Sequence, residues 1–142
     1  MKYLIWFILI FSGFVFSCNQ KKQSNENTGH SSSMESVLPV ITFLEKEFEF
    51  GDIQQGDIVK HVFKFKNTGS TYLKIQSVSA SCGCTTPQWP KEAIAPQAEG
   101  EIYVEFNSQG KMGMQTKTIS ITANTDPAMT QLTIKGNVLT KK

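Results

Sequence analysis

Apolar and polar residues alternate with a period of two along most of the chain after residue 40. The strongest run is Val59–Lys66, in which Val59, His61, Phe63 and Phe65 fall on one face and lysines fall on the other. This alternation predicts a β-strand with one buried face and one solvated face. The same period recurs in other short runs: Ile41–Phe43, Phe48–Ile53, Tyr72–Val78, Glu101–Phe106, Lys117–Ala123 and Gln131–Val138.

These runs amount to about seven strands in about 100 residues, separated by turns rich in Gly, Asn, Asp and Pro, which is typical of an immunoglobulin-like sandwich. We therefore predict an all-β protein, an immunoglobulin-like antiparallel β-sandwich of about seven strands, in residues 39–142. Asn67–Ser70 carries hairpin turn chemistry, so it is expected to join two neighbouring strands. Residues 87–96 hold three prolines and predict a loop that crosses between the sheets, with Trp89 closing the core.

Residues 1–17 predict a cleaved signal peptide. A basic start at Lys2 precedes an apolar run that is shorter than the roughly 20 residues of a membrane-spanning helix. Val15-Phe16-Ser17-Cys18 resembles the lipobox of bacterial lipoproteins, in which the cysteine becomes the lipidated first residue, so Cys18 is the predicted lipidation site. The alternative is an uncleaved anchor with an incidental cysteine. Either way the domain is expected outside the cytoplasm and attached to a membrane.

Residues 18–38 predict a flexible tether, because they are polar and offer almost nothing apolar to bury. A flexible coil of about 20 residues has an r.m.s. span of about 25 Å. Asn19–Lys22 lacks the acidic cluster that resembles a surface-export signal, which favours a location in the cell envelope that faces the periplasm. His30 is expected to be a solvated residue of this tether.

Charge and motifs exclude several functional classes. The chain has 14 Lys and Arg against 12 Asp and Glu, a formal net charge of +2, which predicts no nucleic-acid partner. The sequence has no helically spaced histidine pair, no Gly-rich phosphate loop and no nucleophile beside a base. We therefore expect no enzymatic activity and no cofactor. His61 shares an apolar face, so a partly buried, hydrogen-bonded histidine is expected there.

The most distinctive motif is Ser81–Pro87, in which Gly83 separates Cys82 from Cys84. Two thiols so close can form a small-ring disulfide, share a soft metal or stay reduced. We expect a disulfide, because the compartment is oxidising and the domain has no other cysteine. Gly83 is expected to supply the bend that closure requires.

Four stretches, taken in order, resemble the DUF1573 family of bacterial lipoproteins, whose function is unknown. They are Phe48-Glu49-Phe50-Gly51, Phe65-Lys66-Asn67-Thr68-Gly69, Ser81-Cys82-Gly83-Cys84-Thr85 and Thr122-Ala123-Asn124-Thr125. Gly83 and Thr85 complete the cysteine motif in this resemblance, which covers nearly all of residues 41–139. The chain is also similar to ASH, MSP and hydin-type domains. That similarity implies an immunoglobulin-like sandwich of a kind that mostly binds other proteins, but it implies no activity.

The leading hypothesis is therefore a lipid-anchored binding or structural module whose sheet edge or loops hold another envelope protein or a glycan. One alternative is handling of copper or zinc by Cys82 and Cys84, helped by Met112 and Met114, because thiolates and thioethers suit Cu(I). A second alternative is thiol–disulfide redox chemistry at the same cysteine pair.

Overall fold

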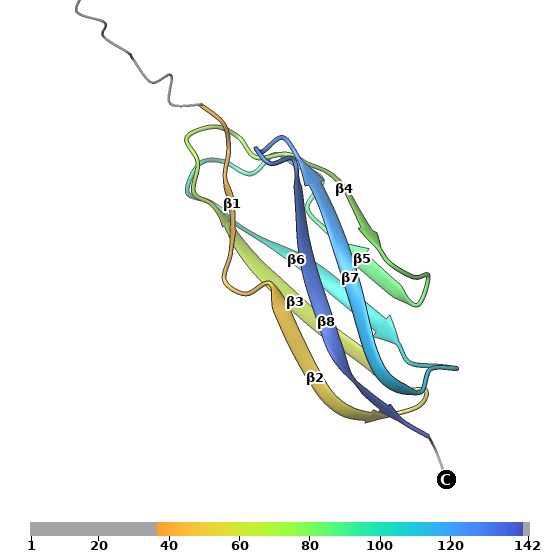
Figure 1. Ribbon diagram of the computed structural model, residues 1–142. Coiled ribbons are helices and arrows are strands. Elements are labelled where there is room, and N and C mark those ends of the chain that lie inside the picture. The colour runs from red at the N-terminus through yellow and green to blue at the C-terminus, as the bar shows by residue number, and fades with distance from the viewer. Residues whose placement is uncertain (1–36, 141–142) are drawn as a thin grey trace, which may run out of the picture. The chain divides into compact units, whose positions relative to one another are not determined.

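The computed structural model describes residues 37–140, in which eight β-strands form the whole regular structure (Figure 1). The strands are β1 (Ile41–Phe43), β2 (Glu47–Gln54), β3 (Ile58–Asn67), β4 (Ile75–Ala80), β5 (Thr85–Gln88), β6 (Glu99–Asn107), β7 (Gly113–Ala123) and β8 (Met129–Leu139). Within this part of the chain, no helix is long and apolar enough to cross a membrane. The predicted signal peptide, Cys18 and nearly all of the predicted tether lie outside the described residues.

The strands form two four-stranded sheets, with orders β1-β3-β6-β5 and β2-β8-β7-β4. The predicted all-β sandwich is confirmed. The pairing of β2 with β8 is parallel, however, whereas the other ladders are antiparallel as predicted. The reason is that the chain does not reverse between β1 and β2. Residues 44–46 carry it onward from one sheet to the other, and the Lys46 carbonyl accepts a hydrogen bond from the Thr133 amide at 2.8 Å.

The core lies between the two sheets and is built from the alternating apolar positions. Phe63, Phe65 and Phe106 are at most 1% exposed, which confirms the predicted inner face of β3. Lys60 and Lys64 point outward from the same strand, 3.8 Å from glutamates of β6. His61 is partly buried, as expected, with its Nε2 atom 3.0 Å from Glu45 and its ring stacked on Phe48.

The predicted hairpin at Asn67–Ser70 is wrong, because β3 and β4 belong to different sheets. Within this turn, the side chain of Asn67 instead forms hydrogen bonds to neighbouring segments. Asn67 is fully buried, and its side-chain amide donates to the carbonyls of Thr71 and Ile94 at 2.8 and 3.0 Å. Its Oδ1 accepts from the amides of Gly69 at 3.1 Å and Val40 at 3.4 Å. The Asn67 side chain thus connects three segments by hydrogen bonds: the chain that crosses from β3 to β4, the start of the domain, and the loop before β6.

The strand count also differs from the prediction, because part of the predicted proline-rich loop is β5. Thr85–Gln88 pairs antiparallel with β6 and lies at the edge of its sheet. Proline is tolerated in an edge strand, where its missing amide can face away from the ladder, so Pro87 does not prevent pairing. Trp89 then packs against the core, as predicted, and Lys91 Nζ lies 3.0 Å above its ring.

Candidate functional site

The cysteine motif forms the turn between β4 and β5, where the chain passes from one sheet to the other. Cys82 and Cys84 are joined by a disulfide, as the sequence predicts, with their Cα atoms 5.2 Å apart. The bond encloses only three residues, so the chain-entropy account assigns it about 1.6 kcal/mol, against about 3 kcal/mol for a 15-residue loop. It therefore adds little to the stability of the fold.

Hydrogen bonds donated by backbone amides hold this turn on both sides of the disulfide. The Ser81 amide donates to the Thr118 carbonyl at 2.9 Å, and the Thr118 amide donates to Ser81 Oγ at 3.2 Å. The Asn107 amide donates to the Cys84 carbonyl at 2.9 Å, and the Thr85 amide donates to the Cys82 carbonyl at 3.2 Å. These four bonds hold the path of the chain in addition to the sulfur–sulfur bond.

Gly83 does not have the conformational role expected from the sequence. It is exposed, and its φ lies outside the left-handed region occupied by four other glycines of the domain. A Cβ added at Gly83 would meet no atom within 4 Å. The glycine is therefore not needed for the bend, and it places no side chain at this exposed point of the turn.

Thr85 is the side chain that faces the sulfurs. It is only 4% exposed, and its hydroxyl lies 3.7 Å from Cys82 Sγ and 4.0 Å from Cys84 Sγ. Neither sulfur of a disulfide carries a proton, so the hydroxyl is the donor. Within residues 37–140, these sulfurs are the hydrogen-bond partners found for the Thr85 hydroxyl. The buried Thr85 hydroxyl thus forms its hydrogen bonds with the cysteine pair.

The structure does not bring the other suggested metal ligands to the cysteines as a built site. Met112 and Met114 are exposed, and Met114 pairs with Asn137 in the ladder with β8. Sulfurs in a disulfide are not thiolates, which are the ligands that soft metals bind. No group of three His, Cys, Asp or Glu side chains suited to a metal occurs in the described part of the chain.

A second feature adjoins the turn: one edge of β7 is open between Gly113 and Lys117. The ladder of β7 with β4 reaches only from Ala123 to Ile119, whereas β7 pairs with β8 along residues 113–122. Figure 1 shows β7 continuing past the point where β4 turns into β5. The amide and carbonyl of Thr118 both face Ser81 of the departing chain.

The alternation of backbone groups identifies what this open edge offers. In a strand, the N–H and C=O of every second residue point to the same side. Met114 and Thr116 therefore present their backbone groups to the same side as Thr118, away from β8. The Met114 carbonyl accepts from the side chain of Gln115 at 3.3 Å. Thr116 has no hydrogen-bond partner on this side among the described residues, so its N–H and C=O are free for a new strand.

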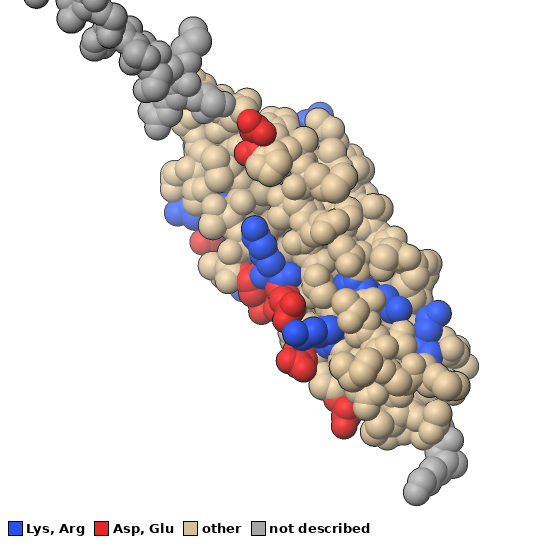
Figure 2. All heavy atoms as spheres, in the orientation of Figure 1, with Lys and Arg blue, Asp and Glu red and all other residues tan. Residues whose placement is uncertain are grey.

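The four strands that end the sheets are better protected than this stretch. β1 has three residues, β5 contains Pro87, and β4 has an irregular register between Ile75 and Ser77. β2 has a bulge at Gly51 and carries Glu47, Glu49 and Asp52, and Figure 2 shows acidic and basic side chains side by side over this strand. Short length, proline, bulges and charge are the usual protections against edge-to-edge pairing.

Apolar and cationic side chains lie beside the open edge. Met112 and Met114 are 64% and 72% exposed. Lys117 lies on the inner side of β7, with its amine 2.9 Å from Gln115 Oε1 and 5.7 Å from the centre of the Phe106 ring. Partial burial, together with the charge of nearby Lys111, holds the pKa of Lys117 below its ordinary value.

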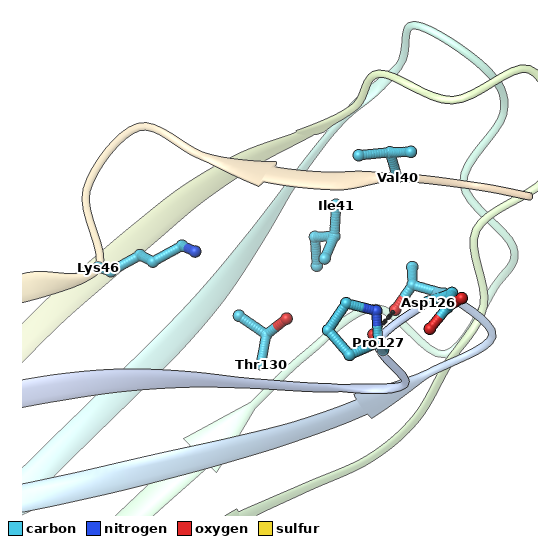
Figure 3. Close-up of a pocket in the computed structure, with 7 residues that line it drawn as sticks. Val40, Ile41, Lys46, Asp126, Pro127 and Thr130 are labelled. Atoms are coloured by element: carbon cyan, nitrogen blue, oxygen red, sulfur yellow. Dashed lines mark hydrogen bonds between the residues drawn. The ribbon is translucent and has the colours of Figure 1, made fainter.

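A small hollow of about 180 Å³ lies at the other end of the sandwich (Figure 3). It lies between the start of β1 in one sheet and the turn into β8 in the other. Its lining residues are Val40, Ile41, Lys46, Thr125, Asp126, Pro127 and Thr130. The Thr125 hydroxyl is already used, because it donates to the Pro127 carbonyl at 2.8 Å. Ligand pockets are commonly about 300 Å³ or larger, so this hollow is not taken as the site.

Sequence reasoning found the cysteine pair but missed the role of Thr85 and the open edge. The alternating pattern begins only at Lys117, so the sequence carries no signal that β7 extends back to Gly113. The contact between Thr85 and the sulfurs depends on the side-chain geometry of the turn, which the residue types do not show.

Comparison with known proteins places this geometry in a family and a fold. Residues 41–138 match the model of DUF1573, described as a protein of unknown function. A protein of unknown function from Porphyromonas gingivalis W83 is 18% identical, with a TM-score of 0.63 over 76% of this chain. This chain spans about half of that protein, 51% of its length. A search of curated protein sequences finds no match.

Two further solved structures share the sandwich. The ASH/PapD-like domain 7 of human CEP192 has a TM-score of 0.62 at 9% identity and is matched over its full length by 92% of this chain. The YadV chaperone has a TM-score of 0.52 at 13% identity, and 69% of this chain matches 51% of it. At these identities the similarity shows the fold alone, a PapD-like immunoglobulin-like sandwich.

Proposed function

The chain belongs to the DUF1573 family, which has no known function, and we propose that it is a non-catalytic binding module of the cell envelope that takes up an extended segment of another protein at the open edge of β7. Cys18 carries the lipid that attaches the module to a membrane, and residues 18–38 are the tether. The partner is a protein segment without regular structure of its own, because strand addition requires a peptide with free backbone groups.

The observation that carries this proposal is the unpaired backbone of Thr116 in a strand whose other side is fully paired with β8. An added strand would bond to its N–H and C=O and extend the sheet in line with β4. Backbone bonds of this kind supply affinity, and side chains beside the edge supply specificity. The exposed thioethers of Met112 and Met114 suit the second task, because methionine adapts to apolar surfaces of different shape.

The position of the edge supports the same proposal. The described chain begins beside the end of β3, because Ile41 pairs with Asn67. The open edge belongs to the start of β7, which pairs with the end of β8 at Val138. Figure 1 shows these two places at opposite ends of the sandwich. A lipid tether attached at the first end therefore joins the domain far from the β7 edge, which leaves this edge accessible to a partner.

The test is site-specific photo-crosslinking in intact cells. A photoreactive amino acid at Met114 is expected to give a discrete adduct, and the same amino acid at Leu44, which is 80% exposed on another surface, is expected to give none. Thr116→Pro should abolish the Met114 adduct, because it removes the free amide without breaking the ladder with β8. Equal adducts at both positions, or an adduct that survives Thr116→Pro, would contradict the proposal.

A further inference from the structure

The disulfide between Cys82 and Cys84 contributes little to the stability of the fold, so we ask whether it has a chemical role. It joins residues two apart, so it links no distant parts of the chain. Ser81 is already bonded to Thr118 in both directions, and the Cys84 carbonyl is already bonded to the Asn107 amide. A disulfide that closes such a short loop gains little from restricting the unfolded chain. It is therefore easily exchanged compared with disulfides that link distant segments.

The surroundings of the cysteine pair favour attack by an external thiolate at Cys82 Sγ over attack at Cys84 Sγ. Cys84 packs against the hydrophobic core, whereas Cys82 is not part of that packing. Gly83 between them is exposed and carries no side chain, and apart from its chain neighbours no atom lies within 4 Å of where a Cβ would stand. A thiolate from outside can therefore approach Cys82 Sγ, with Cys84 as the leaving sulfur.

Thr85 supplies a hydrogen-bond donor to the leaving sulfur. Its buried hydroxyl lies within 4.0 Å of both sulfurs. A thiolate accepts a stronger hydrogen bond than a neutral sulfur does, because bonds to charged groups are stronger. The hydroxyl therefore stabilises the thiolate that forms when the bond breaks, which lowers the pKa of the released thiol and speeds its departure.

From these contacts we infer that the pair is a thiol–disulfide exchange site that passes its disulfide to a protein substrate bearing two cysteine thiols, with Thr85 as a positioning residue. A substrate thiolate attacks Cys82 Sγ, the Cys82–Cys84 bond breaks, and Cys84 leaves as a thiolate. The second substrate thiol, after losing its proton, attacks the substrate sulfur of the mixed disulfide and releases Cys82. Two electrons pass from the substrate to the pair, the substrate becomes a disulfide, and its two protons are taken up by Cys82 and Cys84. The transfer as written is stoichiometric, one disulfide for each chain, so it is compatible with a non-catalytic binding module, and it does not depend on the open edge of β7.

The test uses the full chain with Cys18→Ser, which removes the third thiol, and a reduced Cys-x-x-Cys peptide as the probe. After an acid quench and alkylation, trypsin releases residues 75–91, which hold both cysteines. We expect one peptide disulfide to form for each chain that gains two alkylated cysteines, with circular dichroism of the sandwich unchanged. A single-cysteine probe should be trapped on Cys82. A probe that stays reduced, trapping on Cys84, or loss of the β-sheet signal on reduction would each overturn the inference.

Thr85 variants separate positioning from folding. Thr85→Val removes the hydroxyl at nearly constant volume and should slow exchange about ten-fold, the order expected for one hydrogen bond to a charged atom. It should also raise the pKa of the Cys84 thiol, measured from the pH profile of alkylation in the reduced protein. Thr85→Ser keeps the hydroxyl and should restore both the rate and the pH profile. An unchanged pH profile in Thr85→Val would contradict the assigned role, even if exchange itself occurs.

Discussion

Removing the side chain of Asn67 should destabilise the domain strongly, although Asn67 lies at a turn, because this side chain makes four hydrogen bonds to the backbone. Asn67→Ala deletes bonds of 2.8, 3.0 and 3.1 Å, together with a longer bond to the Val40 amide at 3.4 Å. The Ile94 carbonyl keeps a partner, because the Leu73 amide also donates to it at 2.9 Å. The Thr71 carbonyl and the Gly69 amide lose their bonds to this side chain.

The expected cost follows from these bonds. Each shorter bond contributes a net of about 1 kcal/mol, and buried groups left unpaired cost at least as much, so the free energy of unfolding should fall by about 3 kcal/mol. The assay is urea unfolding followed by tryptophan fluorescence. With an m-value of about 2 kcal/mol/M, the midpoint should move down by about 1.5 M.

A matched control distinguishes burial from the mere loss of hydrogen bonds. Asn124 also makes two side-chain bonds to the backbone, at 2.7 and 3.0 Å, but it is exposed. Asn124→Ala should therefore cost about 1 kcal/mol or less, because water replaces the lost partners. If both variants unfold at similar urea concentrations, the reasoning that Asn67 holds three segments together is refuted.

Four further predictions concern the core, two glycines and the N-terminus. Phe63→Ala should cost about 3 to 5 kcal/mol, because a fully buried aromatic side chain is truncated, and an unchanged melting temperature would contradict the assigned inner face of β3. Gly83→Ala should be neutral or stabilise by up to about 1 kcal/mol in urea unfolding. Gly69→Ala should destabilise clearly, because its Cβ would lie 2.5 Å from the Val40 nitrogen. Intact mass should show a mature chain that begins at a lipidated Cys18, and Cys18→Ser should abolish the adduct. Retention of Met1 without an adduct would exclude lipidation.

Much of the fold could be predicted because burial follows the period of the strand. The inner face of β3 is visible in the sequence as Phe63 and Phe65 between lysines. Pairing between strands is less visible. The parallel partner of Phe48 is Ile134, which lies far along the chain. The residues around Phe48 give no indication of this pairing. Pro87 was misleading because the rule against proline in a ladder does not apply at a sheet edge.

The candidate site was only partly predictable for a related reason. Cys82 and Cys84 are adjacent in sequence, so their pairing could be inferred from residue types and compartment. The commitment of Thr85 to the sulfurs depends on how the turn folds back on itself. The Asn67-Thr68-Gly69 stretch shows the same limit, because its residues favour a tight turn in either a hairpin or a crossover. Only the structure shows that the chain crosses to the other sheet.

Amide hydrogen exchange along β7 tests the open edge most directly. In the free protein, the amides of Gln115 and Lys117 face β8 and should exchange slowly, whereas the amide of Thr116 faces the open side and should exchange fast. The alternation should end at Thr118, because its amide donates to Ser81 Oγ and β4 covers the strand from Ile119 onward. NMR of the full chain resolves these amides one by one. Fast exchange at Thr116 between two protected neighbours is the predicted result, and protection of Thr116 equal to that of Lys117 would contradict the account.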